Sequence, residues 1–282
     1  ICEYNPFHNG HAWQLAQAKA LGAERVAVAM SCSLVQRGAL PLLPEAVRTR
    51  SALTCGADLV FALPAPCACA GAEAFARAGV ALLAAAGCDG LVFGAETPDA
   101  ALLMEAAELL DSGSYRAALK AQLAGGARSF AAARQSAAAQ LASDERVAAL
   151  LDKPNNNLAV EYCRAIRSLA PRMEAYPLPR QGANHGEALH SAHGQFASAS
   201  ALRKLWAEGG ADAVAPYVPE AVFPLYQEAY AAGQYTDFSA AGRCELALLR
   251  SACRGKTPFA DIRGVSEGLE HRLEAAVRTS TT

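Results

Sequence analysis

The sequence predicts an α/β protein built on a doubly wound parallel sheet, with a helical C-terminal segment. The main observation is that short apolar runs alternate with longer Ala-rich stretches, and such alternation is typical of parallel strands joined by crossover helices. A second observation is that only helical patterns follow residue 198. The expected strands are residues 25–30, 58–63, 90–93 and 173–178, and residues 1–4 read as the end of another strand.

The expected helices lie between and after these strands. A long stretch rich in Ala, Gln and Arg is expected to be helical, with a break at Gly125 and Gly126. A polar segment rich in Gly and His, residues 180–195, is expected to be a loop. The helices are residues 9–21, 71–86, 98–110, 115–151, 156–169 and one that begins at Ser198. We therefore predict a main domain of residues 1–207 and a helical domain of residues 208–282.

The composition is that of a soluble globular protein. Of 282 residues, 52% are hydrophobic and 18% are charged, and the formal net charge of −2 excludes a global positive field that would attract nucleic acid. Any RNA contact therefore requires a local basic patch. The nine cysteines form no CxxC pair and follow no apolar leader, so we expect reduced thiols in a cytoplasmic protein. The most apolar stretch contains Glu73 and Arg77, which argues against a membrane span.

The clearest candidate site is residues 4–11 (YNPFHNGH), where the first strand gives way to the first helix. Ligands of open parallel sheets bind at the carboxyl ends of strands, and Gly10 would let a phosphate approach the backbone closely. His8 and His11, three residues apart, can face one spot and donate hydrogen bonds to phosphate oxygens during attack at phosphorus. The alternative is a capped helix with two surface histidines.

A second candidate is residues 196–203 (FASASALR), where a helix is expected to start. The hydroxyls of Ser198 and Ser200, together with free N–H groups and the guanidinium of Arg203, would form an anion site suited to β- and γ-phosphates. The alternative is a simple helix cap. The presence of both segments in one chain supports a phosphate-binding site more strongly than either segment alone.

Together these segments resemble the tRNA(Met) cytidine acetate ligase family of the HIGH-type nucleotidylyltransferase superfamily. The resemblance runs in order along nearly the whole chain. The matching segments are residues 3–11 (EYNPFHNGH), 35–38 (VQRG), 56–60 (GADLV), 63–64 (LP), 93–96 (FGAE), 153–156 (KPNN), 161–162 (EY), Arg180, 196–203 (FASASALR) and 266–270 (SEGLE).

The resemblance implies that ATP activates acetate as acetyl-adenylate, and that the acetyl group passes to N4 of the wobble cytidine in elongator tRNA(Met). It implies an ATP-binding domain at residues 1–207, with His8 and His11 as catalytic residues that hold the reacting phosphates. Mg²⁺ is expected on the triphosphate, and no protein metal site is expected. The implied ATP contacts are Tyr4, Asn5, Pro6, Phe7, Asn9, Gly10, Gly94, Asn155 or Asn156, Arg180, Ser198, Ser200 and Arg203.

The chain departs from the family pattern after Arg180, where His185 and Gly186 stand at the family's Tyr and His positions, and in two stretches that bear on catalysis. Cys32-Ser33-Leu34 stands where the family has Gly-Asn-Phe, and Pro44-Glu45-Ala46 stands where it has Asp-Lys-Trp. An anion in place of a cation beside a triphosphate would replace attraction with repulsion. This suggests a second hypothesis, in which the chain binds nucleotide and tRNA but is slow or inactive as a ligase.

Other interpretations remain open at this point. The chain could be another nucleotidylyltransferase that acts on a small phosphorylated substrate. A Zn²⁺ site is a minor alternative to a substrate-side loop, and it would use His185, Glu187, His190 and His193. A tRNA surface would need several arginines to converge; the candidates are Arg37, Arg48, Arg50, Arg128, Arg134, Arg164, Arg167, Arg172 and Arg243.

Overall fold

The computed structural model describes residues 1–126, 129–179, 189–191, 194–254, 259–262, 265 and 268–281. It divides into two compact units, Ile1–Gln234 and Tyr235–Thr282. The predicted boundary between residues 207 and 208 falls inside a helix of the first unit. Among the described residues, no helix has the length and apolar character needed to cross a membrane.

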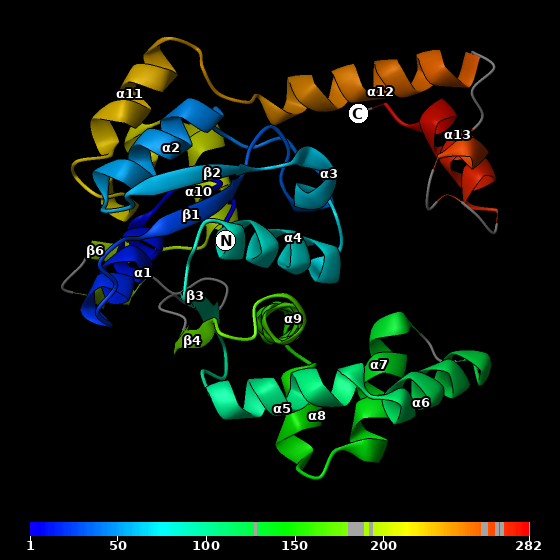
Figure 1. Cartoon of the computed structure of the whole chain (residues 1–282). Coiled ribbons are helices and arrows are strands. Elements are labelled where there is room, and N and C mark those ends of the chain that lie inside the picture. The colour runs from blue at the N-terminus through cyan, green and yellow to red at the C-terminus, as the bar shows by residue number, and fades with distance from the viewer. Residues whose placement is uncertain are drawn as a thin grey trace. The chain divides into compact units, whose positions relative to one another are not determined.

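The first unit contains most of the secondary structure (Figure 1). Its elements are, in chain order, α1 (Asn9–Ala20), β1 (Ala27–Ser31), η1 (Gln36–Gly38), α2 (Glu45–Thr54), β2 (Leu59–Leu63), α3 (Ala65–Ala68), α4 (Ala72–Ala85), β3 (Gly90–Ala95), α5 (Ala100–Asp111), α6 (Gly113–Ala124), α7 (Phe130–Leu141), α8 (Glu145–Leu150), α9 (Pro154–Leu169), β4 (Glu174–Pro179), β5 (Leu189–Ser191), β6 (Gly194–Phe196), α10 (Ala199–Gly209), η2 (Asp212–Tyr217) and α11 (Phe223–Ala231). The second unit contains α12 (Phe238–Arg254), η3 (Phe259–Asp261) and α13 (Leu269–Thr279).

The predicted parallel strands form two hydrogen-bonded pairs. β1 runs parallel to β2 with Ala27 opposite Leu59, and β3 runs parallel to β4 with Gly90 opposite Glu174. Residues 1–4, expected as a strand end, contribute one parallel bridge, in which Cys2 lies opposite Met30. Helices connect the strands of each pair, so the predicted α/β class with crossover helices is confirmed.

The polar segment expected to be a loop contains a short antiparallel hairpin instead. β5 pairs with β6, with Leu189 opposite Phe196 and Ser191 opposite Gly194. Each strand has only three residues, too few to produce a readable period-two pattern. The expectation of a loop throughout residues 180–195 was therefore wrong for the described part of that segment.

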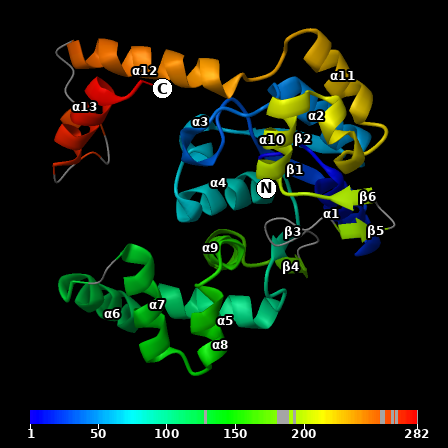
Figure 2. The same ribbon diagram turned by 180° about the vertical axis from the view of Figure 1, so that it is seen from behind.

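Two hydrophobic clusters hold the first unit together. In one cluster α9 lies between α4 and α5, and small buried side chains such as Ala106, Ala159 and Ala165 allow the helices to approach closely (Figures 1 and 2). The other cluster joins α1, β1 and α2 to α10 and α11, and its large buried members include Phe7, Met30 and Tyr226. This second cluster brings residues near position 200 against the N-terminal loop.

A buried guanidinium fixes the ends of the strands near that loop. Arg48 of α2 is fully buried, and its Nε donates to the carbonyl oxygen of Leu43 at 2.9 Å. Its Nη1 donates to the carbonyl oxygens of Glu3 at 2.8 Å and Ser31 at 2.6 Å, and its Nη2 donates to that of Cys32. Burial lowers the pKa of this guanidinium. Because buried carbonyl groups need donors, Arg48 connects the first residues of the chain and the end of β1 to the segment before α2.

Replacing Arg48 with Met should leave four carbonyl groups without this donor and strongly destabilise the first unit. We expect Arg48→Met to lower the free energy of unfolding, measured by urea denaturation, by about 3 kcal/mol or more. Arg50→Met is the matched control, because exposed Arg50 pairs only weakly with exposed Glu228, at 3.6 Å. That change should cost about 0.5 kcal/mol or less. Equal losses in the two variants would contradict the role assigned to Arg48.

Candidate functional site

His8 and His11 lie together at the start of α1. His8 is the N-cap residue, and its Nδ1 accepts a hydrogen bond from the backbone N–H of Gly10 at 3.0 Å. The Nδ1 of His11 accepts from the backbone N–H of His8 at 3.3 Å, and the rings stack with their centroids 3.8 Å apart. The predicted proximity of the two imidazoles is confirmed. The capping alternative holds in part as well, although both side chains are half-buried rather than on an open surface.

The capping bonds decide which ring nitrogen carries the proton. Since Nδ1 accepts in both rings, the proton of a neutral ring lies on Nε2. Each imidazole is therefore a donor through Nε2–H, as a hydrogen bond to a phosphate oxygen requires. Gly10 preserves this arrangement, because a Cβ added there would lie 2.9 Å from Cε1 of His8.

The loop before α1 is held by contacts from distant parts of the chain. The side-chain oxygen of Asn5 accepts a hydrogen bond from the backbone N–H of Leu42 at 2.7 Å. The hydroxyl of Tyr226 on α11 donates to the carbonyl oxygen of Phe7 at 2.7 Å. These contacts supply partners for buried polar groups of a loop that has no ladder of its own.

The amide of Asn9 attaches the same loop to two further segments. Its Nδ2 donates to the carbonyl oxygens of Gln195 at 3.0 Å and Pro216 at 3.3 Å. The predicted contact residues of this segment whose side chains are buried are Tyr4, Asn5, Pro6, Phe7 and Asn9. In this structure those side chains shape the loop, whereas His8, Gly10 and His11 retain partial exposure.

The start of α10 lies against this loop. Ser198 caps the helix, because its Oγ accepts from the backbone N–H of Ala201 at 3.2 Å, and it lies 3.0 Å from Oγ of Ser200. Nη1 of Arg203 donates to the carbonyl oxygen of Asn5 at 2.7 Å, across 198 residues of sequence. The prediction that the two segments lie together is confirmed; their binding of phosphate stays a prediction. Burial lowers the pKa of Arg203, so a nearby anion would stabilise its poorly solvated charge.

The end of β3 carries the other predicted contacts. Gly94 is exposed there, and the carboxylate of Glu96 accepts hydrogen bonds from the backbone N–H of Asn156 at 2.7 Å and from the side-chain amide of Asn155. Glu96 thus occupies the N-terminus of α9, where negative charge is favoured. Sequence reasoning included Glu96 in a motif but assigned it no role. Asn156 is fully buried against Thr97, whereas Asn155 is half-buried.

The N-terminal helix also contacts the strand that leads to Gly94. Nε2 of Gln14 on α1 donates to the carbonyl oxygen of Val92 on β3 at 3.4 Å. The imidazole pair and the end of β3 therefore belong to neighbouring elements. Arg180, the remaining predicted contact, lies outside the described residues.

The two departures from the family pattern lie beside each other. The thiol of Cys32 donates to the carbonyl oxygen of Met30 at 3.3 Å, and burial together with the Glu45 carboxylate raises the pKa of this thiol. The charge of Glu45 also acts on the buried guanidinium of Arg48. Glu45 begins α2, where an acidic residue suits the helix dipole. The anion that replaces the family's cation is therefore partly balanced by a neighbouring cation.

The residues considered for metal binding lie largely beyond the described part of the chain. His185, Glu187 and His193 are outside it, and the side chain of His190 in β5 is not described. Among the described residues, no group of three His, Cys, Asp or Glu side chains suits a metal ion.

Five of the arginines considered for a tRNA surface have other partners within the described part of the first unit. Arg48 is buried, which corrects its assignment to that surface, and four others pair with carboxylates of the first unit. Arg128 and the side chain of Arg37 lie outside the part of the chain that the structure describes. The pairs are Arg50 with Glu228, Arg134 and Arg164 with Glu161, and Arg167 with Glu108.

Comparison with known proteins agrees with this geometry. A family model described as HIGH Nucleotidyl Transferase matches residues 1–282. A tRNA(Met) cytidine acetate ligase from Syntrophotalea carbinolica is 38% identical over 99% of this chain and 66% of its own length. One from Caldanaerobacter subterraneus subsp. tengcongensis is 34% identical over 98% of this chain and 68% of its own length.

Solved structures give the same result. Crystal structures of Thermotoga maritima TmcAL, one apo and one bound with alpha-thio ATP, match with TM-scores of 0.87 and 0.86 at 30% identity. They cover 99% of this chain and 67% and 66% of the matched chains. The chain thus spans about two thirds of the length of the relatives that it matches.

A parallel α/β fold with stacked imidazoles at the start of its first helix is the arrangement expected of the nucleotidylyltransferase class. The chain belongs to the HIGH nucleotidyl transferase family and, within it, to the family of the tRNA(Met) cytidine acetate ligases. The resemblance found in the sequence is confirmed.

The contact between Cys32 and Glu45 can be tested by alkylation. Burial, reinforced by the Glu45 carboxylate, raises the pKa of Cys32 to about 11. Since the thiolate reacts, we expect the alkylation rate of Cys32, followed by mass spectrometry, to reach half of its maximum near pH 11. Glu45→Gln should lower that midpoint. It should not move the midpoint of Cys55, whose pKa is also raised to about 11 but by burial alone. A midpoint for Cys32 near the usual value of about 8.5 would contradict the arrangement.

Proposed function

We propose that this chain binds ATP where the N-terminal loop meets α10, and that it activates acetate there as acetyl-adenylate. The acetyl group then passes to N4 of the wobble cytidine of elongator tRNA(Met), in the cytoplasm. The observation that carries the proposal is the hydrogen bond from Arg203 to the carbonyl oxygen of Asn5, because it unites the two segments expected to hold the triphosphate. The names of the relatives and the alpha-thio ATP in a similar structure support it.

The site residues would act by positioning and by neutralising charge. In the first step an acetate oxygen attacks the α-phosphorus, the bond to the bridging oxygen of pyrophosphate breaks, and pyrophosphate leaves. The Nε2–H groups of His8 and His11 would donate to the phosphate oxygens that gain charge. Arg203 and the hydroxyls of Ser198 and Ser200 would hold the outer phosphates. Mg²⁺ would arrive with the triphosphate as part of the substrate.

In the second step the cytidine amine attacks the acetyl carbonyl, AMP leaves, and the nitrogen loses a proton. Of the two candidate amides near the end of β3, Asn155 suits a nucleotide contact better than Asn156, because Asn156 is fully buried and bonded to Thr97. Gly94 and Arg180 complete the proposed nucleotide contacts.

Glu45 favours a second candidate function. An exposed carboxylate at a position where the family has a cation would weaken triphosphate binding or catalysis, although Arg48 offsets part of its charge. In this version the chain binds ATP and tRNA but ligates slowly. ATP binding without acetate-dependent exchange of label between pyrophosphate and ATP would favour it.

Acetate-dependent exchange between ATP and pyrophosphate tests the proposed function directly. We expect exchange in the wild type and a loss of about 100-fold or more in His11→Ala, because one donor to the reacting phosphates is removed. His271→Ala, which alters an exposed histidine on α13, is the control and should exchange normally. Undiminished exchange in His11→Ala would remove this residue from the mechanism.

Gly10→Ala tests the tight packing between the helix start and the His8 ring. The added Cβ would lie 2.9 Å from His8 Cε1, so the imidazole must move. We expect the dissociation constant for ATP, measured by calorimetry, to rise about tenfold, which corresponds to about 1.4 kcal/mol. Gly71→Ala, at the start of α4, is the control because a Cβ there meets nothing within 4 Å. An unchanged dissociation constant in Gly10→Ala would contradict the assigned role of His8.

A further inference from the structure

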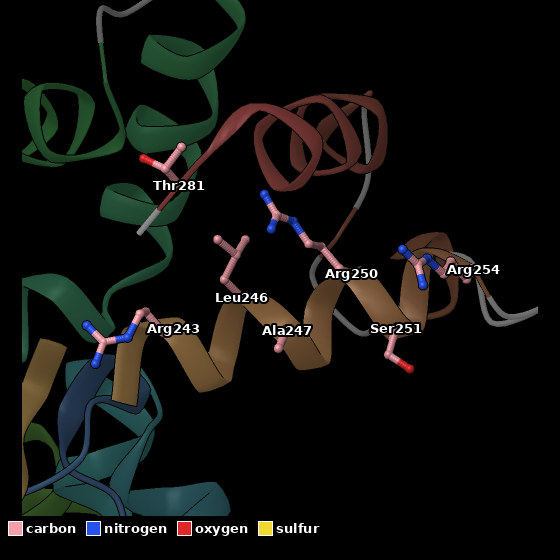
Figure 3. Close-up of a pocket in the computed structure, with 7 residues that line it drawn as sticks. All are labelled: Arg243, Leu246, Ala247, Arg250, Ser251, Arg254 and Thr281. Atoms are coloured by element: carbon pink, nitrogen blue, oxygen red, sulfur yellow. The ribbon is translucent and has the colours of Figure 1, made fainter. Parts of the chain in front are cut away.

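Three arginines line a groove along α12 in the second unit (Figure 3). The α12 groove has a volume of about 420 Å³ and is lined by Arg243, Arg250 and Arg254, with Leu246, Ser251 and Thr281 between and beside them. All three guanidinium groups belong to exposed residues. Only Arg243 was considered for a basic surface from the sequence.

The spacing of the arginines places them on one face of the helix. Positions 243, 250 and 254 are separated by seven and four residues, which correspond to about two turns and about one turn. They therefore form a single row about 17 Å long. A row of this length can meet several successive phosphates of one nucleic-acid strand.

The charges of this row are available to an anionic partner. In the described part of the second unit, none of the three arginines forms an ion pair with a carboxylate. The groove residues between them are apolar or carry a hydroxyl. The Nη1 of Arg243 donates to Oγ of Ser239 at 2.8 Å, which leaves most of its donors for a ligand.

Arg250 is held in place by the end of α13. Its Nε donates to the carbonyl oxygen of Val277 at 3.2 Å, and its Nη2 donates to that of Ser280 at 2.5 Å. These bonds stabilise the packing of α12 against α13 around Leu246 and Val277. One wall of the groove is therefore fixed before any ligand binds, which reduces the entropy lost on binding.

We propose that the α12 groove binds the phosphate backbone of the tRNA substrate. The inference rests on the proposed function, which supplies a polyanion as substrate. The chain has a formal net charge of −2, so its whole-molecule field does not attract RNA. The row of three arginines in the α12 groove supplies the local positive charge that RNA binding then requires. Contacts of this kind add affinity without reading the sequence.

The test compares tRNA binding by the full chain and by two double variants. Arg243→Ala combined with Arg254→Ala removes two guanidinium groups from the groove and leaves Arg250 to hold α13. Arg272→Ala combined with Arg278→Ala removes the same charge from exposed positions on α13 that do not line the groove. The dissociation constant for elongator tRNA(Met) is measured at several salt concentrations, together with acetate-dependent exchange of pyrophosphate.

We expect the groove variant to weaken tRNA binding about tenfold. The slope of the logarithm of the binding constant against the logarithm of the salt concentration should become less steep by about 1.5, as for two lost phosphate contacts. The α13 variant should bind like the wild type, and Arg243→Lys with Arg254→Lys should retain most of the affinity. Normal tRNA binding and salt dependence in the groove variant, or a wild type that does not bind tRNA, would overturn the inference. Groove-dependent tRNA binding without exchange would contradict the proposed function and leave the groove supported.

Discussion

The hydrogen bond between the guanidinium of Arg203 and the carbonyl oxygen of Asn5 is the contact on which the candidate site depends. The N-terminal loop has little regular structure, so its buried polar groups need partners from elsewhere. Leu42, Tyr226 and Arg203 supply three of them, from segments far apart in the sequence. The same contacts that satisfy the loop bring a serine-capped helix to the stacked imidazoles, so the stability of the loop and the construction of the site have one cause.

Electrostatics links this loop to the neighbouring strand ends. The buried Arg48 binds carbonyl groups from the first residues, from the end of β1 and from the segment before α2. The carboxylate of Glu45 interacts electrostatically with the guanidinium of Arg48. In the sequence, Glu45 only reverses the charge that the family has at this position. In the structure, Glu45 is also the electrostatic partner of Arg48. The effect of Glu45 on a bound triphosphate depends on how much of its charge Arg48 offsets.

The sequence predicts those parts of the fold that local pattern controls. The apolar runs that became β1 to β4 are short and bounded by turns, and the order of strands and helices implies parallel pairing. The proximity of the two phosphate motifs was predictable because the family resemblance covers both. The burial of Arg48, the capping role of Glu96 and the β5–β6 hairpin were not predictable, since each depends on contacts between segments that only the folded chain brings together. For the same reason, the sequence did not reveal the groove at Arg243, Arg250 and Arg254, which Thr281, just after α13, helps to line.

A double-mutant cycle on ATP binding tests most directly whether the two segments form one triphosphate site. The cycle measures the dissociation constants of the wild type, His11→Ala, Ser200→Ala and the double variant by calorimetry. If both side chains contact the same triphosphate, their effects should be coupled by about 1 kcal/mol. Effects that add to within about 0.3 kcal/mol would indicate independent positions and would contradict the shared site.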